Sequence, residues 1–509
     1  MDVTQILMLI TILVYLAAMV GIGAVLAKQN QTTDDFYLGG RTLGPLVTAM
    51  SAEASDMSSW LLMGLPGVAY LSGTADAAWT AIGLAIGTYV NWLVVAKRLR
   101  NYTHVCGNST TLPLFFSNRY RDNKRILSVI AALLIIIFFV PYTASGFAAC
   151  GKLFANLFGM DYLPAMLISA IVIVAYTTLG GFLAASTTDF VQSIVMTIAI
   201  VVVFGFGISK VGSFSAVMDN AKSMAGYFSL THTHDVATGT ASPYSLLQIF
   251  STLAWGLGYF GMPHVLLRFM AIGDANKLKL SRRVATVWVV ISMAVSVFIG
   301  VIGNAMTKAS VLPTLKDPET IILVVSDLIS KHGVLATIIA GLILAGILAA
   351  TMSTADSQLL AASSSASQNI LKEVFMKDMS EKTGMLIARI TVLVIALIGV
   401  FIARNPDSSV FQIVSFAWAG FGASFGPLVL LALFWKRSTF QGALCGMVSG
   451  GVMVFVWKFL IRPMGGALGI YELLPAFLLG LAVNVIVSLL TPAPSREVQD
   501  EFDKVASMK

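Results

Sequence analysis

Residues 51–60 combine polar groups that could bind a small cation inside a membrane. They include the carboxylates of Glu53 and Asp56 and four serine hydroxyls, and they interrupt an otherwise apolar stretch at residues 46–70. An ionised carboxylate near the bilayer centre costs at least ~2.5 to 3.5 kcal/mol, so it normally faces water, an opposite charge or a bound ion. Hydroxyls and the free carbonyls of an unwound helix are hard oxygen ligands for such an ion. We therefore expect ion binding rather than covalent chemistry, with Asp56 as a candidate site residue.

A second apolar stretch is interrupted at residues 255–263. This segment contains three glycines and Pro263. Glycine permits unusual backbone angles and proline removes a hydrogen-bond donor, so the composition predicts a locally unwound helix. The glycine spacing also fits the GxGxxG pattern of nucleotide-binding loops, but no strand or soluble βαβ unit surrounds it. We expect a second broken helix, not a nucleotide site.

A third polar group lies at residues 346–357, where hydrocarbon would be expected. The adjacent hydroxyls of Ser353 and Thr354 precede Asp356 in an otherwise apolar helix. A single hydroxyl in such a helix usually bonds its own backbone. The pair beside a carboxylate, in a chain with two other interrupted helices, favours ion ligation.

The composition is that of a polytopic membrane protein. Of 509 residues, 57% are hydrophobic and only 11% are charged, and the mean hydropathy is +0.85. The net charge of +7 comes from basic residues in short loops, which orient a membrane protein and do not indicate nucleic-acid binding. Three cysteines at unrelated spacings predict neither a disulfide framework nor a zinc site.

The apolar stretches predict an all-α membrane protein with about thirteen transmembrane helices. A crossing needs roughly 20 apolar residues, and the candidate helices begin near Ile6, Leu46, Ala77, Ile126, Leu163, Phe190, Ser245, Val284, Val334, Met385, Val410, Gly442 and Tyr471. Most Lys and Arg residues lie inside if the N-terminus is outside and the C-terminus inside. We expect residues 1–492 to form a single transporter domain and residues 493–509 a short cytoplasmic tail.

The two interrupted helices occupy matching positions if helix 1 is peripheral. Helix 2, with residues 51–60, opens one group of five helices, and helix 7, with residues 255–263, opens the next. An odd number of helices per group makes the second copy insert upside down, and paired broken helices are typical of inverted-repeat transporters. We therefore expect helices 2–6 and 7–11 to form a 5+5 inverted repeat, with helices 12–13 peripheral.

The chain resembles the sodium/solute symporter family, and most closely its bacterial sodium/proline symporters, almost from end to end. The resemblance rests on Leu38-Gly39-Gly40-Arg41, residues 55–67, Gly180-Gly181-Phe182, residues 255–261 with Pro263-His264, Met352-Ser353-Thr354 and residues 418–423. The motifs around Asp56 and Trp255 are the specific ones. The resemblance implies a LeuT-type fold and transport without covalent chemistry or a cofactor other than the coupling ion.

The resemblance implies a sodium site between helices 2 and 9. Its ligands would be the backbone carbonyls of Ala54, Met57 and Ala350 and the hydroxyls of Ser353 and Thr354. Asp56 would be essential for sodium coupling, and both a direct ligand and a nearby source of negative field stay open for it.

The resemblance also implies a substrate pocket beside both breaks. Its residues would be Ser58, Trp60, Gly64, Tyr142, Trp255, Tyr259 and Pro263. Aromatic walls suit the pyrrolidine ring of L-proline, and a helix N-terminus with polar groups would receive the carboxylate. Taken singly, the aromatic residues also fit helix packing or interfacial positions.

For three other residues, more than one role is open. The resemblance suggests Arg41 and Asp189 for the cytoplasmic pathway or gate, although a topology-setting arginine and a solvated aspartate fit these positions as well. Glu53 departs from the small or neutral residue expected there. Three alternatives stay open for it: lower cation selectivity, a side chain that faces water, or a protonated carboxyl.

We expect a multi-pass symporter of a bacterial cytoplasmic membrane that couples inward sodium flow to L-proline uptake by alternating access. Two alternatives remain: a sodium-coupled symporter of the same fold for another small solute, such as pantothenate or another amino acid, and a transporter-like membrane sensor. No output domain follows Pro492 in the sequence, which disfavours the sensor. The five scattered histidines form no metal or triad pattern, so no enzyme is expected.

Overall fold

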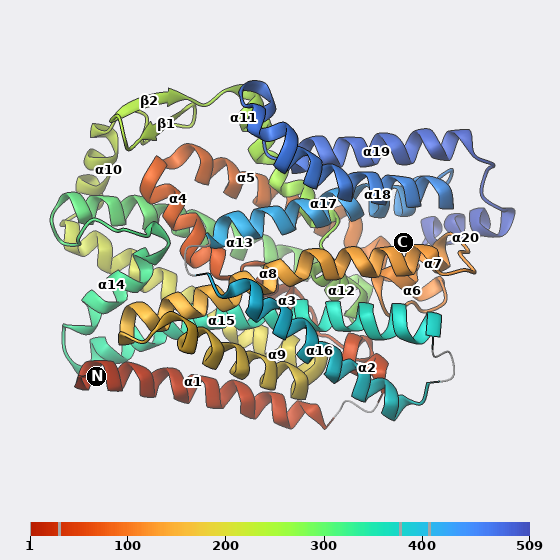
Figure 1. Cartoon of the computed structure of the whole chain (residues 1–509), viewed down its shortest axis with the longest axis horizontal. Helices are drawn as coiled ribbons and strands as arrows, with labels where there is room; N and C mark the ends of the chain where they lie inside the picture. The colour runs from red at the N-terminus through yellow and green to blue at the C-terminus, as the bar shows by residue number, and fades with distance from the viewer. Residues whose placement is uncertain (1, 29–31, 376–378, 406–408, 509) are drawn as a thin grey trace.

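The computed structural model describes residues 2–28, 32–375, 379–405 and 409–508 as a bundle of helices that mostly run along one axis (Figure 1). Ten helical segments in these ranges are long and apolar enough to cross a membrane. They include all or most of α1 (Val3–Ala27), α5 (Thr74–Val90) with α6 (Ala96–Val105), α8 (Ile126–Phe158), the second part of α9 (Tyr162–Val211), α13 (Leu278–Lys308), α15 (Val334–Ser364), α16 (Glu381–Ala403), α17 (Val410–Phe434), α18 (Phe440–Val456) and α19 (Leu473–Leu490). The chain is therefore a predominantly helical, multi-pass membrane protein.

Two further helical stretches are divided. The first consists of α3 (Pro45–Asp56) and α4 (Leu65–Ser72), with a π-helical turn, η2 (Trp60–Gly64), between them. The second consists of α11 (Leu246–Leu253) and α12 (Pro263–Ala271), with a 3₁₀ segment, η4 (Ala254–Phe260), between them. Both divisions overlap the segments for which the sequence predicts interruptions, although η2 extends beyond the first and η4 begins before the second.

The short elements gather at the two ends of the bundle. Figure 1 shows α10 (Phe214–Ser223), β1 (His232–Asp235) and β2 (Thr240–Pro243) at one end, hereafter the hairpin end. The strands pair antiparallel, with His232 opposite Pro243. The opposite end, hereafter the α20 end, carries α6, α7 (Leu112–Arg119) and α20 (Arg496–Ser507). Helices α2 (Thr33–Leu38) and α14 (Ile321–Ser330) complete the described α-helices, and further short 3₁₀ and π-helical segments adjoin some of them.

Helix α15 lies at the centre of the packing. It contacts α1, α8, α9, α14, α16 and α3, and nearly every residue from Ala340 to Ser364 is buried. Its polar residues are therefore surrounded by protein, where each must find a partner or a ligand. The outer helices show the opposite pattern, because Val14 of α1, Leu397 of α16 and Leu490 of α19 are exposed, as expected for side chains that face lipid.

Helix α9 is long but not continuous in conformation. It contains 50 residues, and Gly181 within it has φ 62° and ψ −170°. Only glycine adopts such angles without strain, so Gly181 divides α9 into two helical arms.

Candidate ion-binding and substrate-binding site

The break after α3 frees the carbonyl of Ala54. In a continuous helix this carbonyl would accept from the amide of Ser58. Instead, Met57 has φ −76° and ψ 63°, and the Ser58 amide donates to the carbonyl of Asp56 at 2.8 Å. The Ala54 oxygen is therefore available to a group outside its own helix.

A hydroxyl of helix α15 forms a hydrogen bond to that free oxygen. The Ser353 hydroxyl donates to the Ala54 carbonyl at 2.8 Å and lies 3.2 Å from the Ala350 carbonyl. The Thr354 hydroxyl donates to the same Ala350 carbonyl at 3.1 Å. Four of the predicted sodium ligands thus form one buried cluster of oxygen atoms. Met57, the fifth, is fully buried at the end of α3.

Asp56 turns towards a different neighbour. Its Oδ2 accepts a 2.5 Å hydrogen bond from the Tyr259 hydroxyl of η4. Its backbone carbonyl accepts from the Tyr142 hydroxyl and the Trp60 indole, each at 3.3 Å. Asp56 therefore joins α3, α8 and η4, and its carboxylate is bonded to Tyr259.

The second break brings aromatic side chains to the first. The Trp60 and Trp255 rings are stacked with centroids 6.0 Å apart, and Trp255 is stacked on Tyr471 at 5.1 Å. Tyr259 packs edge-on against Trp418 at 5.0 Å, and the Trp418 indole donates to the Trp255 carbonyl at 2.7 Å. Trp60, Trp255 and Tyr259 thus form a continuous aromatic wall, to which Trp418 of α17 and Tyr471 just before α19 add two rings.

This wall depends on a close approach at Gly258. A Cβ at this position would lie 1.9 Å from Nε1 of Trp418, so only glycine allows η4 to pack against α17.

The remaining predicted residues surround the wall. Ser58 lies in the first break, Gly64 packs against Phe411 of α17, and Pro263 begins α12.

A cavity of about 340 Å³ leads from this wall towards the hairpin end. Trp255, Phe411 and Tyr471 line its inner part, and Thr233 of β1 lines it as well. The cavity gives the aromatic wall a path to one side of the bundle.

At the α20 end, Arg41 ties the two broken helices together. Its guanidinium donates to the Met270 carbonyl at 2.6 Å and to the Ser109 carbonyl at 2.7 Å, and Nε donates to Asn108 at 3.1 Å. The adjacent backbone also pairs, because the Leu43 amide donates to the Ala271 carbonyl. These contacts hold the two segments together at the α20 end, where Asn108 also lines a separate cavity of about 990 Å³.

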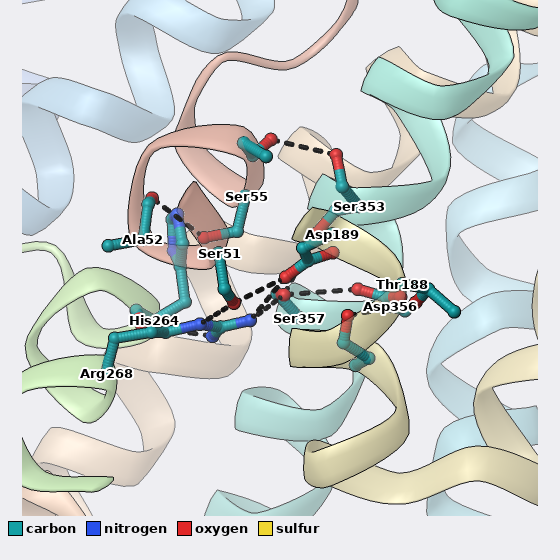
Figure 2. Close-up of polar contacts among 12 residues, drawn as sticks. Ser51, Ala52, Ser55, Thr188, Asp189, His264, Arg268, Ser353, Asp356 and Ser357 are labelled. Carbon is teal, nitrogen blue, oxygen red and sulfur yellow. Dashed lines mark hydrogen bonds and ion pairs between the residues drawn. The ribbon is translucent and has the colours of Figure 1, made fainter. Parts of the chain in front are cut away.

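Asp189 belongs to a buried ionic network, not to a solvated surface (Figure 2). Its Oδ2 lies 3.2 Å from the guanidinium of Arg268 and accepts from the Ser51 hydroxyl at 2.6 Å. Arg268 also donates to Ser51 at 2.9 Å and to Ser357 at 2.5 Å, and the Ser357 hydroxyl donates to Asp356. The network joins α3, α9, α12 and α15 one helical turn from the Ser353 cluster.

Sequence reasoning missed several residues around this site. Arg268 and Ser357 received no role, although a charged residue in a buried segment directly after a break is itself a signal. No pattern in the sequence around Tyr471 indicates that its ring would join the aromatic wall. The structure also excludes one alternative for Glu53: its side chain does not face water, since the residue is 1% exposed and bonds the Trp92 indole at 2.8 Å.

The fold and this site define an ion-coupled membrane transporter, and the chain belongs to the sodium:solute symporter family, whose model matches residues 36–450. It is 40% identical to the osmoregulated proline transporter of Bacillus subtilis over 488 residues, 96% of each chain. It is 41% identical to the sodium/proline symporter of Escherichia coli over 500 residues, 97% of this chain and 95% of that one. The sodium/proline symporter of Salmonella typhimurium is 41% identical over 502 residues, 98% of this chain and 96% of that one.

Two solved structures share the fold. A Na⁺-coupled sialic acid symporter in a substrate-bound outward-open state gives a TM-score of 0.78 at 19% identity, covering 96% of this chain and 99% of that one. A nucleobase-cation-symport-1 family transporter in a closed conformation gives a TM-score of 0.55 at 14% identity, covering 92% and 98% of the two chains. At these identities the likeness concerns the fold alone.

Proposed function

We propose that this protein couples the inward flow of sodium to the uptake of L-proline across a bacterial cytoplasmic membrane. The observation that carries the proposal is the hydrogen bond from the Ser353 hydroxyl to the Ala54 carbonyl, which joins α15 to the broken end of α3. The relatives named as sodium/proline symporters, at 40–41% identity over nearly the whole chain, support this choice of ion and solute.

In the proposed fold, thirteen helices cross the membrane as a LeuT-type inverted repeat. The pair α3 and α4 counts as one broken crossing, as does α11 with α12, and Gly181 divides α9 into two crossings. Three shorter apolar helices, at Trp60–Ser72, Tyr162–Ala175 and Leu246–Phe260, support this count beside the ten long segments. Helices 2–6 and 7–11 then form the two repeats, and helices 1, 12 and 13 are peripheral.

In the proposed orientation, the N-terminus and the hairpin end lie outside and α20 lies in the cytoplasm. Figure 1 shows the N-terminus at the hairpin end, and α20 at the opposite end. The excess of Lys and Arg in the loops assigned to the cytoplasm supports this orientation. The cavity beside Trp255 would then be the outer approach, and the contacts of Arg41 would hold the broken helices together on the cytoplasmic side.

The sodium ion would be held by the carbonyls of Ala54, Met57 and Ala350 and the hydroxyls of Ser353 and Thr354. Five oxygens suit a dehydrated sodium ion, and hard oxygen ligands are what the break and α15 provide. Asp56 would act from beside this cluster, because its carboxylate holds Tyr259. Sodium binding would thereby fix the end of α3 against both α15 and η4.

Proline would bind against the aromatic wall. Trp60, Tyr142, Trp255 and Tyr259 would contact the pyrrolidine ring, with Ser58, Gly64 and Pro263 completing the pocket. Because sodium would stabilise α3 in the arrangement that holds Trp60 and Tyr259, each ligand should raise the affinity for the other reciprocally. Loss of sodium to a sodium-poor cytoplasm would then release proline, after the two helix groups rock against each other.

Uptake of radiolabelled proline by proteoliposomes tests this function. We expect an inward sodium gradient to drive accumulation, and collapse of the gradient to abolish it. Competition by a panel of amino acids and pantothenate separates proline from other solutes. Uptake that ignores the sodium gradient would contradict the proposal, and stronger competition by another solute would change only the assigned substrate.

A further inference from the structure

Glu53 is a buried carboxylate with one unsatisfied oxygen. Its Oε1 accepts the hydrogen bond from the Trp92 indole, on the π-helical segment η3 (Asn91–Val95). Its Oε2 has no hydrogen-bond partner among the described residues. A buried carboxylate without a positive partner is destabilising by several kcal/mol unless an ion or a hydrogen-bond donor compensates it. Either a proton or a bound cation is therefore needed at Oε2.

Asp56 lies on the same face of α3, three residues further on. Side chains at this spacing are neighbours, with Cβ atoms about 5–6 Å apart. Asp56 is fully buried, and its Oδ1 also lacks a hydrogen-bond partner among the described residues. The ion pairs found in the described part of the chain include neither carboxylate. Two adjacent carboxyl groups are thus buried together, and no basic side chain forms an ion pair with either of them in the described part of the chain.

Other oxygen atoms surround the two carboxylates. The Tyr259 hydroxyl bonds Oδ2 of Asp56 at 2.5 Å. The Thr88 hydroxyl of α5 lies beside that of Tyr259, is buried, and is left without a well-formed hydrogen bond in the described structure. Carboxylates and hydroxyls from α3, α5 and η4 therefore converge, and all of them are hard ligands.

We propose that Glu53, Asp56, Tyr259 and Thr88 form a second sodium site, separate from the cluster of Ala54, Ala350, Ser353 and Thr354. The proposal rests on the function proposed above, because sodium is the ion that this transporter would carry. The two sites lie on different sides of α3, since Ala54 is rotated about 100° from Glu53 around the helix axis. Glu53 is the ligand that sets the second site apart.

The ligand set fits a monovalent ion better than a divalent one. Calcium takes six to eight oxygen ligands, and no group of three or more Asp, Glu, His or Cys residues suited to a metal occurs in the described part of the chain. Sodium would also have a mechanical effect here. It would tie Glu53 and Asp56 of one broken helix to Tyr259 of the other, and so hold a wall of the substrate pocket.

The ratio of ²²Na⁺ to labelled proline taken up by proteoliposomes tests the second site. We expect two sodium ions per proline in the wild type and one in Glu53→Gln, with uptake still driven by sodium. Glutamine keeps an oxygen for the Trp92 indole, so the variant removes the charge and little else. Glu373→Gln is the matched control, because this carboxylate is distant from Glu53 in the sequence and forms an ion pair with Arg125. The ratio of sodium to proline in this variant should stay at two.

A ratio of one in the wild type, or an unchanged ratio in Glu53→Gln, would overturn the second site and leave the proposed function standing. Uptake without any sodium dependence would instead overturn the proposed function. If Glu53→Gln does not fold, equilibrium binding of ²²Na⁺ to purified Thr88→Val replaces it. We expect the affinity for one of two ions to fall about tenfold, and two ions bound with wild-type affinity would contradict the site.

Discussion

The hydroxyl of Tyr259 and the carboxylate of Asp56 are joined by a 2.5 Å hydrogen bond between the two broken helices. Tyr259 belongs to η4 and Asp56 is the last residue of α3, 203 positions apart in the chain. One bond therefore links a residue proposed to act on sodium with a residue proposed to bind substrate.

Tyr259→Phe should uncouple these two elements. A hydrogen bond to a charged group contributes about 1.5–3 kcal/mol, so we expect the affinity for proline in the presence of sodium to fall by at least about tenfold. Tyr162→Phe is the matched control, because the Tyr162 hydroxyl bonds the Ala403 carbonyl of α16 and contacts neither broken helix in its hydrogen bond. Equal affinities in the two variants would argue against a coupling role for the Asp56–Tyr259 bond.

Ser353→Ala should raise the sodium concentration needed for half-maximal proline uptake by about tenfold or more, which corresponds to about 1.4 kcal/mol. The variant removes a proposed ligand and its bond to Ala54. Ser326→Ala provides the comparison, since the Ser326 hydroxyl is equally buried but bonds only its own helix at Ile322. Ser326→Ala should leave the sodium dependence unchanged, and a shared shift in both variants would point to general destabilisation.

Arg268→Met should lower the thermal stability of the purified protein strongly. Removing one partner of a buried ion pair costs about 3–5 kcal/mol, because the other charge is left uncompensated. Adding Asp189→Asn to Arg268→Met should recover part of the loss. Thermal unfolding in detergent measures both, and a double variant no more stable than the single one would show that the Asp189 charge does not depend on Arg268.

Gly258→Ala should disturb the aromatic wall. Its Cβ would overlap Trp418, so η4 or α17 must shift, and we expect a lower unfolding temperature together with weaker proline binding. Gly21→Ala is the control, because a Cβ there meets no atom within 4 Å. Wild-type stability and binding in Gly258→Ala would contradict the close packing of η4 on α17.

The local features of the site could be predicted from the sequence, because each of them depends on consecutive residues. Polar residues at 51–60 and the glycines with Pro263 at 255–263 disfavour a continuous apolar helix, and α3 and α11 end within or beside these segments. The adjacent hydroxyls of Ser353 and Thr354 are equally visible. Such signals depend only on backbone preference and on the cost of polar groups in a membrane.

The partners of these groups could not be predicted in the same way. Arg268 meets Asp189 across 79 positions, and Glu53 meets Trp92 across 39. These contacts depend on how helices pack side by side, which no local pattern specifies. The aromatic contribution of Tyr471 likewise exists only because its ring stacks on Trp255. The β1–β2 hairpin was also missed, because its short polar strands resemble a loop.

The most direct test of the account is proline binding to purified protein as sodium concentration is varied, compared between the wild type and the double variant Ser353→Ala with Thr354→Ala. The account predicts that sodium raises the affinity of the wild type for proline, and that the double variant, still folded by its thermal unfolding profile, loses this response. An undiminished sodium response in the folded double variant would remove the proposed ligands and contradict the account.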